Sequence, residues 1–304
     1  MTWHRLRSKL ALIAAGWMVC AVAAAQAPEA PAVVSGTLKM ARDRGTLIIG
    51  YREASVPFSY LSSLREPIGY SIDLCKLLAS DIAEAVHKEL RLQWVPVTSA
   101  NRIDAVASGK VDIECGSTTN NLERRKQVSF SPTLFIAGTK LMVKKGSGIR
   151  DYRDLAGKRV AVTAGTTNEK TMRDLAARFK LDLQIVVARD HDESLAHLRQ
   201  GRADAFATDD VLLYGFIAQK QLKAELEVVG DFLSYDPYGV MYRKDDPQMA
   251  RVVNDSFQRM AKDGEIERQY KRWFTRNLPL GVSIDLPMSP QLEAIIEATA
   301  ARSF

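Results

Sequence analysis

Two different patterns of hydrophobic and polar residues alternate along this chain. Short apolar runs, such as the one from Thr46 to Gly50, are typical of buried strands. Residues 71–90 instead place Leu74, Leu78 and Ile82 on one face at the spacing of an amphipathic helix. This alternation predicts an α/β architecture.

The same succession of elements occurs twice. In the first half we expect strands at 46–50, 91–97 and 111–115, and helices at 71–90 and 101–108. In the second half we expect strands at 159–163, 184–188 and 203–208, and helices at 167–179 and 193–200. Gly109 and Gly201 follow equivalent helices as C-caps, and residues 108–113 are echoed by residues 200–205. The repeat predicts two α/β lobes of like construction.

Two extended segments flank the second repeat, at residues 138–145 and 238–244. If both connect the lobes, the second lobe is inserted into the first, and helices at 246–262 and 264–274 return to lobe one. The expected bounds are 36–139 plus 240–304 for lobe one and 140–239 for lobe two. Such paired strands form a hinge. The alternative is that both segments are ordinary core strands.

The N-terminus has the order of a secretory signal peptide. Basic residues precede an apolar run from Leu10 to Cys20, and small residues follow up to Ala27. The run is too short to span a bilayer comfortably, which disfavours the alternative of a membrane anchor. We expect residues 1–25 to be the signal peptide and the mature protein to be periplasmic and soluble. Lipid modification of Cys20 is disfavoured because bulky residues precede it.

The basic character of the chain owes much to this segment. The formal charge of +6 falls to +3 when its three basic residues are removed. The remaining basic residues are interspersed with acids, unlike the continuous stripe that follows nucleic-acid phosphates, so nucleic-acid binding is not expected.

The cysteines and histidines give no metal motif. No CxxC or HExxH spacing occurs and the four histidines are scattered, so we expect no metal or other cofactor. Export permits a disulfide between Cys75 and Cys115, but the sequence does not show whether they approach each other. Two buried thiols is the interpretation that we slightly favour, because one residue lies in a predicted helix and the other at a strand end.

Hydroxyl, guanidinium and carboxylate side chains gather just after the predicted strands. Ligands of open α/β sheets bind beyond the carboxyl ends of the strands. Together these side chains predict a site for a small anion that also carries a positive group. The candidates are Arg52, Ser99, Arg102, Ser117, Thr119, Arg124, Thr167, His191 and Asp209.

Two segments also have the spacing of helix starts. Thr166 stands three residues before Glu169, as in a capping box, and Asn120 with Glu123 could act similarly in lobe one. Exposed N–H groups at helix starts bind carboxylates, although such residues often only cap the helix. Arg124 beside one start favours the binding role, because guanidinium matches a carboxylate bidentately.

At this point the residues resemble a known family. The chain is similar, from about residue 38 to 274, to the polar amino-acid solute-binding proteins (family 3) of ABC transporters, and within them to the branch that binds glutamate and aspartate. The resemblance implies a two-lobed periplasmic binding protein fold (type II), a monomer, and permease subunits as partners. The segments that carry it are 50–59, 98–102, 114–121 with Arg124, 164–167, 190–191 and 263–274.

The resemblance also implies a role for each candidate. Arg124, Ser117, Thr119 and Thr167 would hold the α-carboxylate of the ligand, and Asp209 its ammonium. The side-chain carboxylate would be surrounded by Arg52, Ser99, Arg102 and His191. Relatives that bind basic amino acids carry an acid at the position of Arg52, so the charge is reversed here. Tyr51 departs from the histidine of the glutamate/aspartate branch, which leaves the preference between the two acids open.

The charges agree with an acidic amino acid. Three arginines against Asp209 leave an excess of positive charge, to which a protonated His191 would add. Glutamine would leave buried arginines poorly matched, so we expect strong discrimination against it. Glutamate and aspartate differ by one methylene, worth only about 1–3 kcal/mol, and both should bind.

Two other classes of function remain as alternatives. An exported enzyme on the same scaffold, such as a lyase acting on a small carboxylate, would need a positioned acid or base, for which His191 and Glu53 are candidates. No nucleophile–base–orienter trio is evident, so we expect a binding protein and no catalytic residue. A sensor ectodomain is the other alternative, disfavoured because no downstream membrane span follows.

Overall fold

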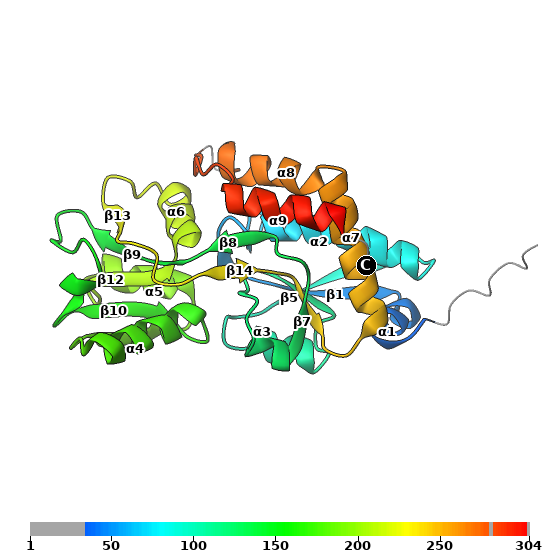
Figure 1. Cartoon of the computed structure of the whole chain (residues 1–304), viewed down its shortest axis with the longest axis horizontal. Helices are drawn as coiled ribbons and strands as arrows, with labels where there is room; N and C mark the ends of the chain where they lie inside the picture. The colour runs from blue at the N-terminus through cyan, green and yellow to red at the C-terminus, as the bar shows by residue number, and fades with distance from the viewer. Residues whose placement is uncertain (1–33, 280–281, 303–304) are drawn as a thin grey trace, which may run out of the picture. The chain divides into compact units, whose positions relative to one another are not determined.

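The computed structural model describes residues 34–279 and 282–302. The predicted signal peptide lies outside the described residues. The chain from Val34 onward is one compact unit, and within it the strands form two five-stranded sheets (Figure 1). None of the described helices combines the length and the apolar character needed to cross a membrane.

The first sheet is mostly parallel and contains one strand from far along the chain. Its order is β5 (Arg91–Pro96), β1 (Thr46–Tyr51), β6 (Ile113–Cys115), β15 (Met241–Arg243), β7 (Val128–Phe130). Strand β15 pairs antiparallel with both β6 and β7, although it follows the whole second sheet in the chain. The chain therefore leaves the first lobe after β7 and returns to it at β15.

Helices cover both faces of this sheet. One face packs on α3 (Arg102–Ala107), through a cluster that includes Val106 and Met241. The other packs in a large core formed by α1 (Gly36–Arg44), α2 (Tyr70–Ala85), α7 (Pro247–Lys262), α8 (Glu265–Tyr270), a π-helical turn (Lys271–Thr275) and α9 (Pro290–Ala301). A small sheet of β2 (Ala54–Ser55), β3 (Ser59–Leu61) and β4 (Pro67–Ile68) lies beside this core.

The second sheet repeats the first in its parallel half. Its order is β11 (Gln184–Ala188), β10 (Arg159–Thr163), β12 (Ala205–Asp209), β9 (Thr139–Lys144), β13 (Leu226–Val229). One face packs on α4 (Thr167–Phe179), and the other packs on α5 (His191–Arg199) and α6 (Asp210–Gln219). Single 3₁₀ turns occur at Arg124–Lys126 in the first lobe and Tyr152–Leu155 in the second.

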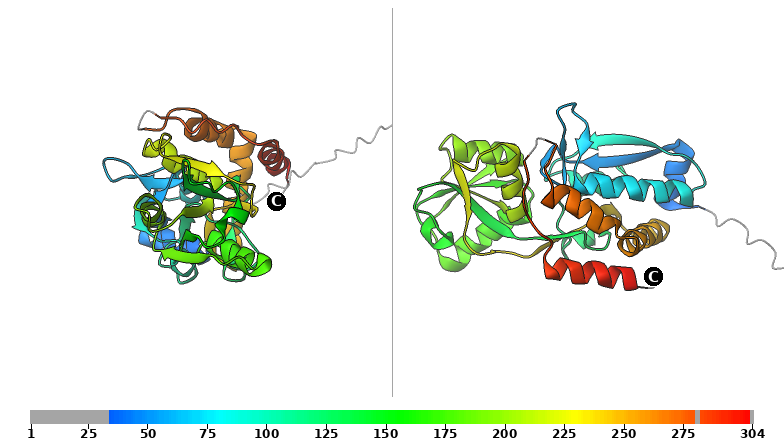
Figure 2. Two further views of the ribbon diagram at one scale, coloured as in Figure 1. Left: turned by 90° about the vertical axis from the view of Figure 1, so that its left-hand side faces the viewer. Right: turned by 90° about the horizontal axis from the view of Figure 1, so that it is seen from above.

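Two strands run side by side between the sheets. They are β8 (Phe135–Ala137) and β14 (Asp236–Tyr238), which pair antiparallel (Figures 1 and 2). The predicted α/β fold of two lobes joined by two strands is confirmed. Strand β8 ends just before the expected segment 138–145, and β14 overlaps the expected segment 238–244 only at Tyr238.

The strand and helix boundaries follow local chemistry. Helix α4 spans the predicted 167–179, and Thr166 caps it by accepting the N–H of Glu169 at 3.1 Å. Helix α2 is shorter than the predicted 71–90, because His87 adopts a left-handed conformation (φ +51°) that ends the helical run.

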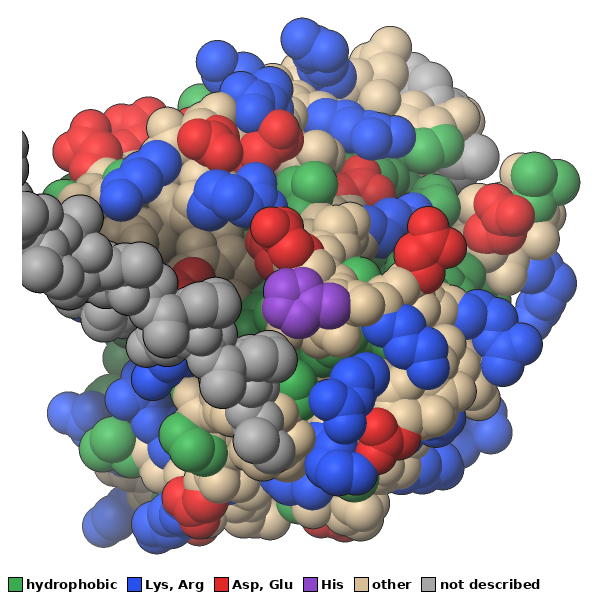
Figure 3. All heavy atoms as spheres, turned by 90° about the vertical axis from the view of Figure 1, so that its right-hand side faces the viewer, with side chains coloured by type: hydrophobic (Ala, Val, Ile, Leu, Met, Phe, Trp, Pro, Cys, Tyr) green, Lys and Arg blue, Asp and Glu red, His purple; other side chains and the backbone are tan. Residues whose placement is uncertain are grey.

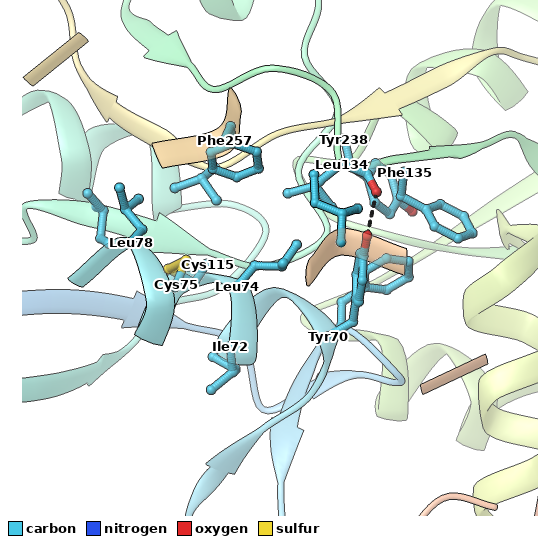
Figure 4. Packing of buried hydrophobic residues seen from close by; sticks show 14 of the residues in the cluster. Tyr70, Ile72, Leu74, Cys75, Leu78, Cys115, Leu134, Phe135, Tyr238 and Phe257 are labelled. Carbon is cyan, nitrogen blue, oxygen red and sulfur yellow. Dashed lines mark hydrogen bonds between the residues drawn. A yellow bond between two sulfur atoms is a disulfide. The ribbon is translucent and has the colours of Figure 1, made fainter. Parts of the chain in front are cut away.

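A disulfide joins Cys75 on α2 to Cys115 at the end of β6 (Figure 4). The interpretation of two buried thiols is therefore wrong. Packing of α2 against the sheet brings the two Cα atoms to 6.3 Å, within the distance that a disulfide requires. Nearby in the same core, the hydroxyl of Tyr70 donates to the carbonyl of Leu134, next to strand β8.

The distribution of basic side chains is visible on one face of the molecule. Figure 3 shows Lys and Arg side chains interspersed there with Asp and Glu. This face carries no continuous positive track of the kind that nucleic-acid phosphates require.

Candidate functional site

Three arginines of the first lobe are buried at the carboxyl ends of its strands. Arg52 directly follows β1, Arg102 begins α3 after β5, and Arg124 begins the 3₁₀ turn that follows β6. Their exposed fractions are 2%, 2% and 7%. Fully buried guanidinium groups are rare in proteins unless they are paired, so this cluster needs a partner.

Hydrogen bonds within the protein satisfy these groups only in part. Arg124 donates Nη1–H to the carbonyl of Thr119 (2.9 Å), and Arg102 donates Nη1–H to the carbonyl of Ser117 (3.3 Å). Several buried polar atoms around the cluster have no hydrogen-bond partner among the residues that the structure describes. They are Arg52 Nη1, Arg102 Nε, Ser99 Oγ and Ser117 Oγ. These donors can bind the oxygen atoms of a small anion.

The second lobe places its three candidates at the starts of its helices. Thr167 begins α4 after β10, His191 begins α5 after β11, and Asp209 is the residue before α6 at the end of β12. The side chain of Asp209 is 3% exposed and accepts from Asn168 Nδ2 at 2.8 Å. It also accepts from the hydroxyl of Tyr238 on the connecting strand β14.

The two sets meet between the lobes. The hydroxyls of Thr119 and Thr167 lie 3.2 Å apart, and Arg124 donates Nη2–H to the carbonyl of Gly165 at 3.3 Å. They enclose a small cavity of about 10 Å³, roughly the volume that one water molecule needs. It is lined by Arg102, Ser117, Thr119, Thr166, Thr167, Asn168, His191 and Asp209.

The structure thus brings the nine predicted residues into one region. Six line this cavity directly. Arg52, Ser99 and Arg124 lie immediately beside it: Arg52 acts electrostatically on Arg102 and His191, the carbonyl of Ser99 faces Gly165, and Arg124 bridges Thr119 and Gly165.

Burial and mutual repulsion make the positive charges costly. Loss of hydration, together with the nearby Arg102, lowers the pKa of Arg52 and of Arg124 to about 9. Loss of hydration also raises the pKa of Asp209 to about 7, with the nearby Asp236 as the second cause. An anion would stabilise the guanidinium groups and a cation would stabilise the carboxylate.

Two expectations about this region are wrong. His191 does not supply extra positive charge, because burial and the neighbouring Arg52 and Arg102 hold its pKa well below the usual range. Its Nδ1 is hydrogen-bonded to the hydroxyl of Thr163 at 2.8 Å. A neutral imidazole can still donate or accept one hydrogen bond.

The expected helix start at Asn120 and Glu123 is also absent from the described structure. Only the short 3₁₀ turn follows, and Asn121 caps it by accepting the N–H of Arg124 at 2.9 Å. The first lobe therefore presents a guanidinium group at this point, while the second lobe presents a true helix start at α4.

Four further residues belong to the site and were not among the candidates. Thr166 and Asn168 line the cavity, Tyr238 positions Asp209, and Glu114 lies buried beside Arg52. The positions of Thr166 and Asn168 on either side of Thr167 at a helix start could have suggested these two. No sequence signal points to Tyr238, since its contact depends on where β14 crosses. Among the described residues, no group of three or more His, Cys, Asp or Glu side chains could hold a metal ion.

The arrangement resembles those of known proteins in sequence and in fold. Residues 47–276 match the family described as bacterial extracellular solute-binding proteins, family 3. The L-glutamate/L-aspartate-binding protein of Pseudomonas aeruginosa is 43% identical, over 89% of this chain and 90% of that protein. The glutamate/aspartate import solute-binding protein of Escherichia coli is 38% identical, over 90% of this chain and 91% of that protein.

A solved structure agrees with these matches. An ancestral arginine-binding protein bound to arginine superposes with a TM-score of 0.69 at 31% identity, over 76% of this chain and 99% of the other. Matches of this extent, in sequence and in three dimensions, exceed what a shared fold alone requires. The chain belongs to the bacterial extracellular solute-binding proteins, family 3.

Proposed function

We propose that this protein binds L-glutamate and L-aspartate outside the cytoplasm and delivers them to an ABC importer. The observation that carries the proposal is the trio of buried arginines at a small cavity, which is lined by Arg102 of that trio and by the buried carboxylate of Asp209. An acidic amino acid has two carboxylates and one ammonium group, so each charged group of the ligand finds an opposite charge.

The ligand has one orientation that uses every donor. Arg124 is bound to Thr119 and beside Thr167, at the end of the cavity where a helix start and a guanidinium group can share the α-carboxylate. Asp209 would accept the ammonium group. The unpaired donors of Arg52 and Arg102 would hold the side-chain carboxylate, with the hydroxyls of Ser99 and Ser117 beside them and His191 across the cavity.

The relatives support this ligand class. Two proteins of about 40% identity are named for glutamate and aspartate, whereas a relative named as a glutamine-binding protein, from Bacillus subtilis, is 30% identical. The guanidinium group of Arg52 distinguishes an acidic side chain from the neutral amide of glutamine, because a buried positive charge left without an anion is costly.

Capture would proceed by closure of the lobes, with residues 36–139 plus 240–304 as lobe one and 140–239 as lobe two. Ligand would bind the arginines of lobe one first, and lobe two would then close through β8 and β14. Only contacts absent from the open form can favour closure, and Thr167, His191 and Asp209 supply them.

Delivery of the bound amino acid to an ABC importer implies where the protein is located and which subunits it contacts. We infer export through the N-terminal signal peptide to the periplasm, a monomeric mature protein, and recognition of the closed form by permease subunits. Binding without turnover fits the chemistry, since Glu53 is exposed, and burial together with the neighbouring arginines holds the pKa of His191 well below its usual range. One solved relative is titled as an amino acid-binding precursor of a dehydratase, so turnover is the outcome to test for.

Calorimetric titration of the purified protein with all twenty amino acids tests the proposal. Glutamate and aspartate should bind and the others should bind far more weakly. Arg124→Ala should weaken binding by about 100-fold or more, because it removes a buried charge that pairs with the α-carboxylate. Arg125→Ala is the matched control, since Arg125 is exposed and outside the cavity. Recovery of unchanged glutamate after incubation supports binding, whereas a product would support an enzyme. If neither acid binds, the proposal fails.

A further inference from the structure

Glu114 is a buried carboxylate beneath the arginine cluster. It lies in β6, its side chain is 0% exposed, and one of its oxygens accepts the hydroxyl of Thr118 at 2.8 Å. The other oxygen, Oε1, has no hydrogen-bond partner within residues 34–279 and 282–302. A Cβ on Gly116 would lie 2.3 Å from Oε1 and 2.8 Å from Cγ of Arg52, so the carboxylate and the arginine stem flank the same residue.

The carboxylate acts on the arginines through its charge and not through direct pairing. Among the described ion pairs, none includes Glu114. Yet Glu114 raises the pKa of each of Arg52, Arg102 and Arg124 against the lowering effect of burial. A buried charge this close to three others, in a medium of low polarity, changes the energy of any ion bound among them.

We propose that Glu114 is a specificity-determining residue whose charge makes the cavity select ligands with one net negative charge over ligands with two. This inference rests on the proposed function. Glu114 does not line the cavity, so its effect reaches the ligand through the electrostatic field. The other buried acids near the site, Asp210 and Asp236, act on Asp209, and Asp236 also acts on Arg124, whereas only Glu114 among these three acids acts on Arg52 and Arg102.

The charges of the two ligands explain why one unit of negative charge on Glu114 changes selectivity. Glutamate and glutarate share a carbon skeleton and two carboxylates, but glutarate lacks the ammonium group and carries −2 where glutamate carries −1. With Glu114 charged, the second negative charge is poorly balanced. Without that charge the cavity is one unit more positive, and the dianion gains more than the monoanion, because Coulomb energy scales with ligand charge.

Titration of the wild-type protein and Glu114→Gln with L-glutamate and with glutarate at pH 7.5 tests the inference. The ratio of the glutarate Kd to the glutamate Kd should fall by about tenfold or more in the variant, because removing one unit of buried charge changes the Coulomb energy of the dianion by more than that of the monoanion. Glutarate cannot make the carboxylate–ammonium contact at Asp209 in either the wild-type protein or the variant. This difference between the ligands therefore cancels when the two Kd ratios are compared.

Glu114→Asp is the matched control, because it shortens the side chain and keeps the carboxylate. Glu114→Met, uncharged and of similar length, serves if the glutamine variant does not fold. An unchanged ratio in both uncharged variants, or an equal fall in Glu114→Asp, would overturn the inference while wild-type glutamate binding leaves the proposed function standing. If the wild-type protein binds neither acid, both proposals fail.

Discussion

Gly215 of helix α6 lies against the backbone carbonyl of Val56, with no room for a side chain between them. A Cβ at Gly215 would be 2.3 Å from that oxygen. The two residues belong to different lobes, and neither lines the cavity between Arg102 and Asp209. The lobes therefore touch at a point that lies outside the lining of the cavity.

Gly215→Ala should weaken glutamate binding, because the added methyl group keeps the lobes from reaching this contact. We expect a loss of affinity of about tenfold or more in a calorimetric titration. The ligand-free protein should not be destabilised, since alanine is favoured over glycine inside a helix by up to about 1 kcal/mol. Thermal unfolding without ligand is the control, and unchanged affinity would show that this contact is not required for closure.

Arg52→Met should weaken binding of glutamate far more than binding of glutamine. The substitution removes the buried charge expected to face the side-chain carboxylate, which corresponds to about 30-fold or more in Kd for the acid. Glutamine has no charge there to lose. Arg91→Met, at the exposed start of β5, is the control and should change neither affinity. An equal loss for both ligands would place the side-chain carboxylate elsewhere.

Glutamate affinity should rise with pH between about 6 and 8. The pKa of Asp209 is raised to about 7, so below this pH the carboxyl is protonated and pairs poorly with an ammonium group. Binding near pH 7 should therefore release a proton, measurable by calorimetry in buffers of different ionisation enthalpy. Asp209→Asn should bind weakly and without this slope, whereas Asp255→Asn, an exposed carboxylate on α7, should behave as wild type.

The stability of the ligand-free protein should depend on the same group in the opposite direction. Because the folded-state pKa of Asp209 lies above its ordinary value of 3.8, protonation favours the folded form. This contribution is full below about pH 4 and is lost as pH rises through 7. Asp209→Asn should thus raise the unfolding temperature more at pH 8 than at pH 5, and equal effects at both would argue against the raised pKa.

Reduction of the Cys75–Cys115 disulfide should destabilise the first lobe. The bond closes a loop of 40 residues, for which chain entropy predicts about 4 kcal/mol of stabilisation. Denaturant unfolding of the Cys75→Ala, Cys115→Ala double variant, compared with the wild-type protein under oxidising and reducing conditions, measures this. The variant should lose sensitivity to reductant, and a wild-type protein indifferent to reductant would contradict the pairing.

The repeat of strands and helices was predictable because each lobe obeys the same local rules. Strand ends, glycine C-caps and the Thr166 cap are properties of neighbouring residues, so the arginines after β1, β5 and β6 could be assigned to one edge of a sheet before the structure was known. Helix α9 was not predicted. The charge state of His191 was wrong because it depends on two arginines brought close only by folding.

Contacts between segments that lie far apart in the chain could not be predicted from the sequence. The cysteine pairing depends on how α2 packs on β6, and the bond between Tyr238 and Asp209 depends on where β14 crosses between the sheets. Glu114 follows the pattern of a strand residue, and its meaning emerges only when Gly116 places it behind Arg52.

Strand β14 carries Tyr238, whose hydroxyl donates to Asp209, and the same strand pairs through Pro237 and Tyr238 with residues 119–120. The proposed hinge and the proposed binding surface thus share one segment of backbone. A related protein that evolves to bind a different ligand must keep or rebuild this connecting strand together with the cavity. Substitution of cavity side chains alone would alter the rate of lobe closure as well as the ligand that is bound.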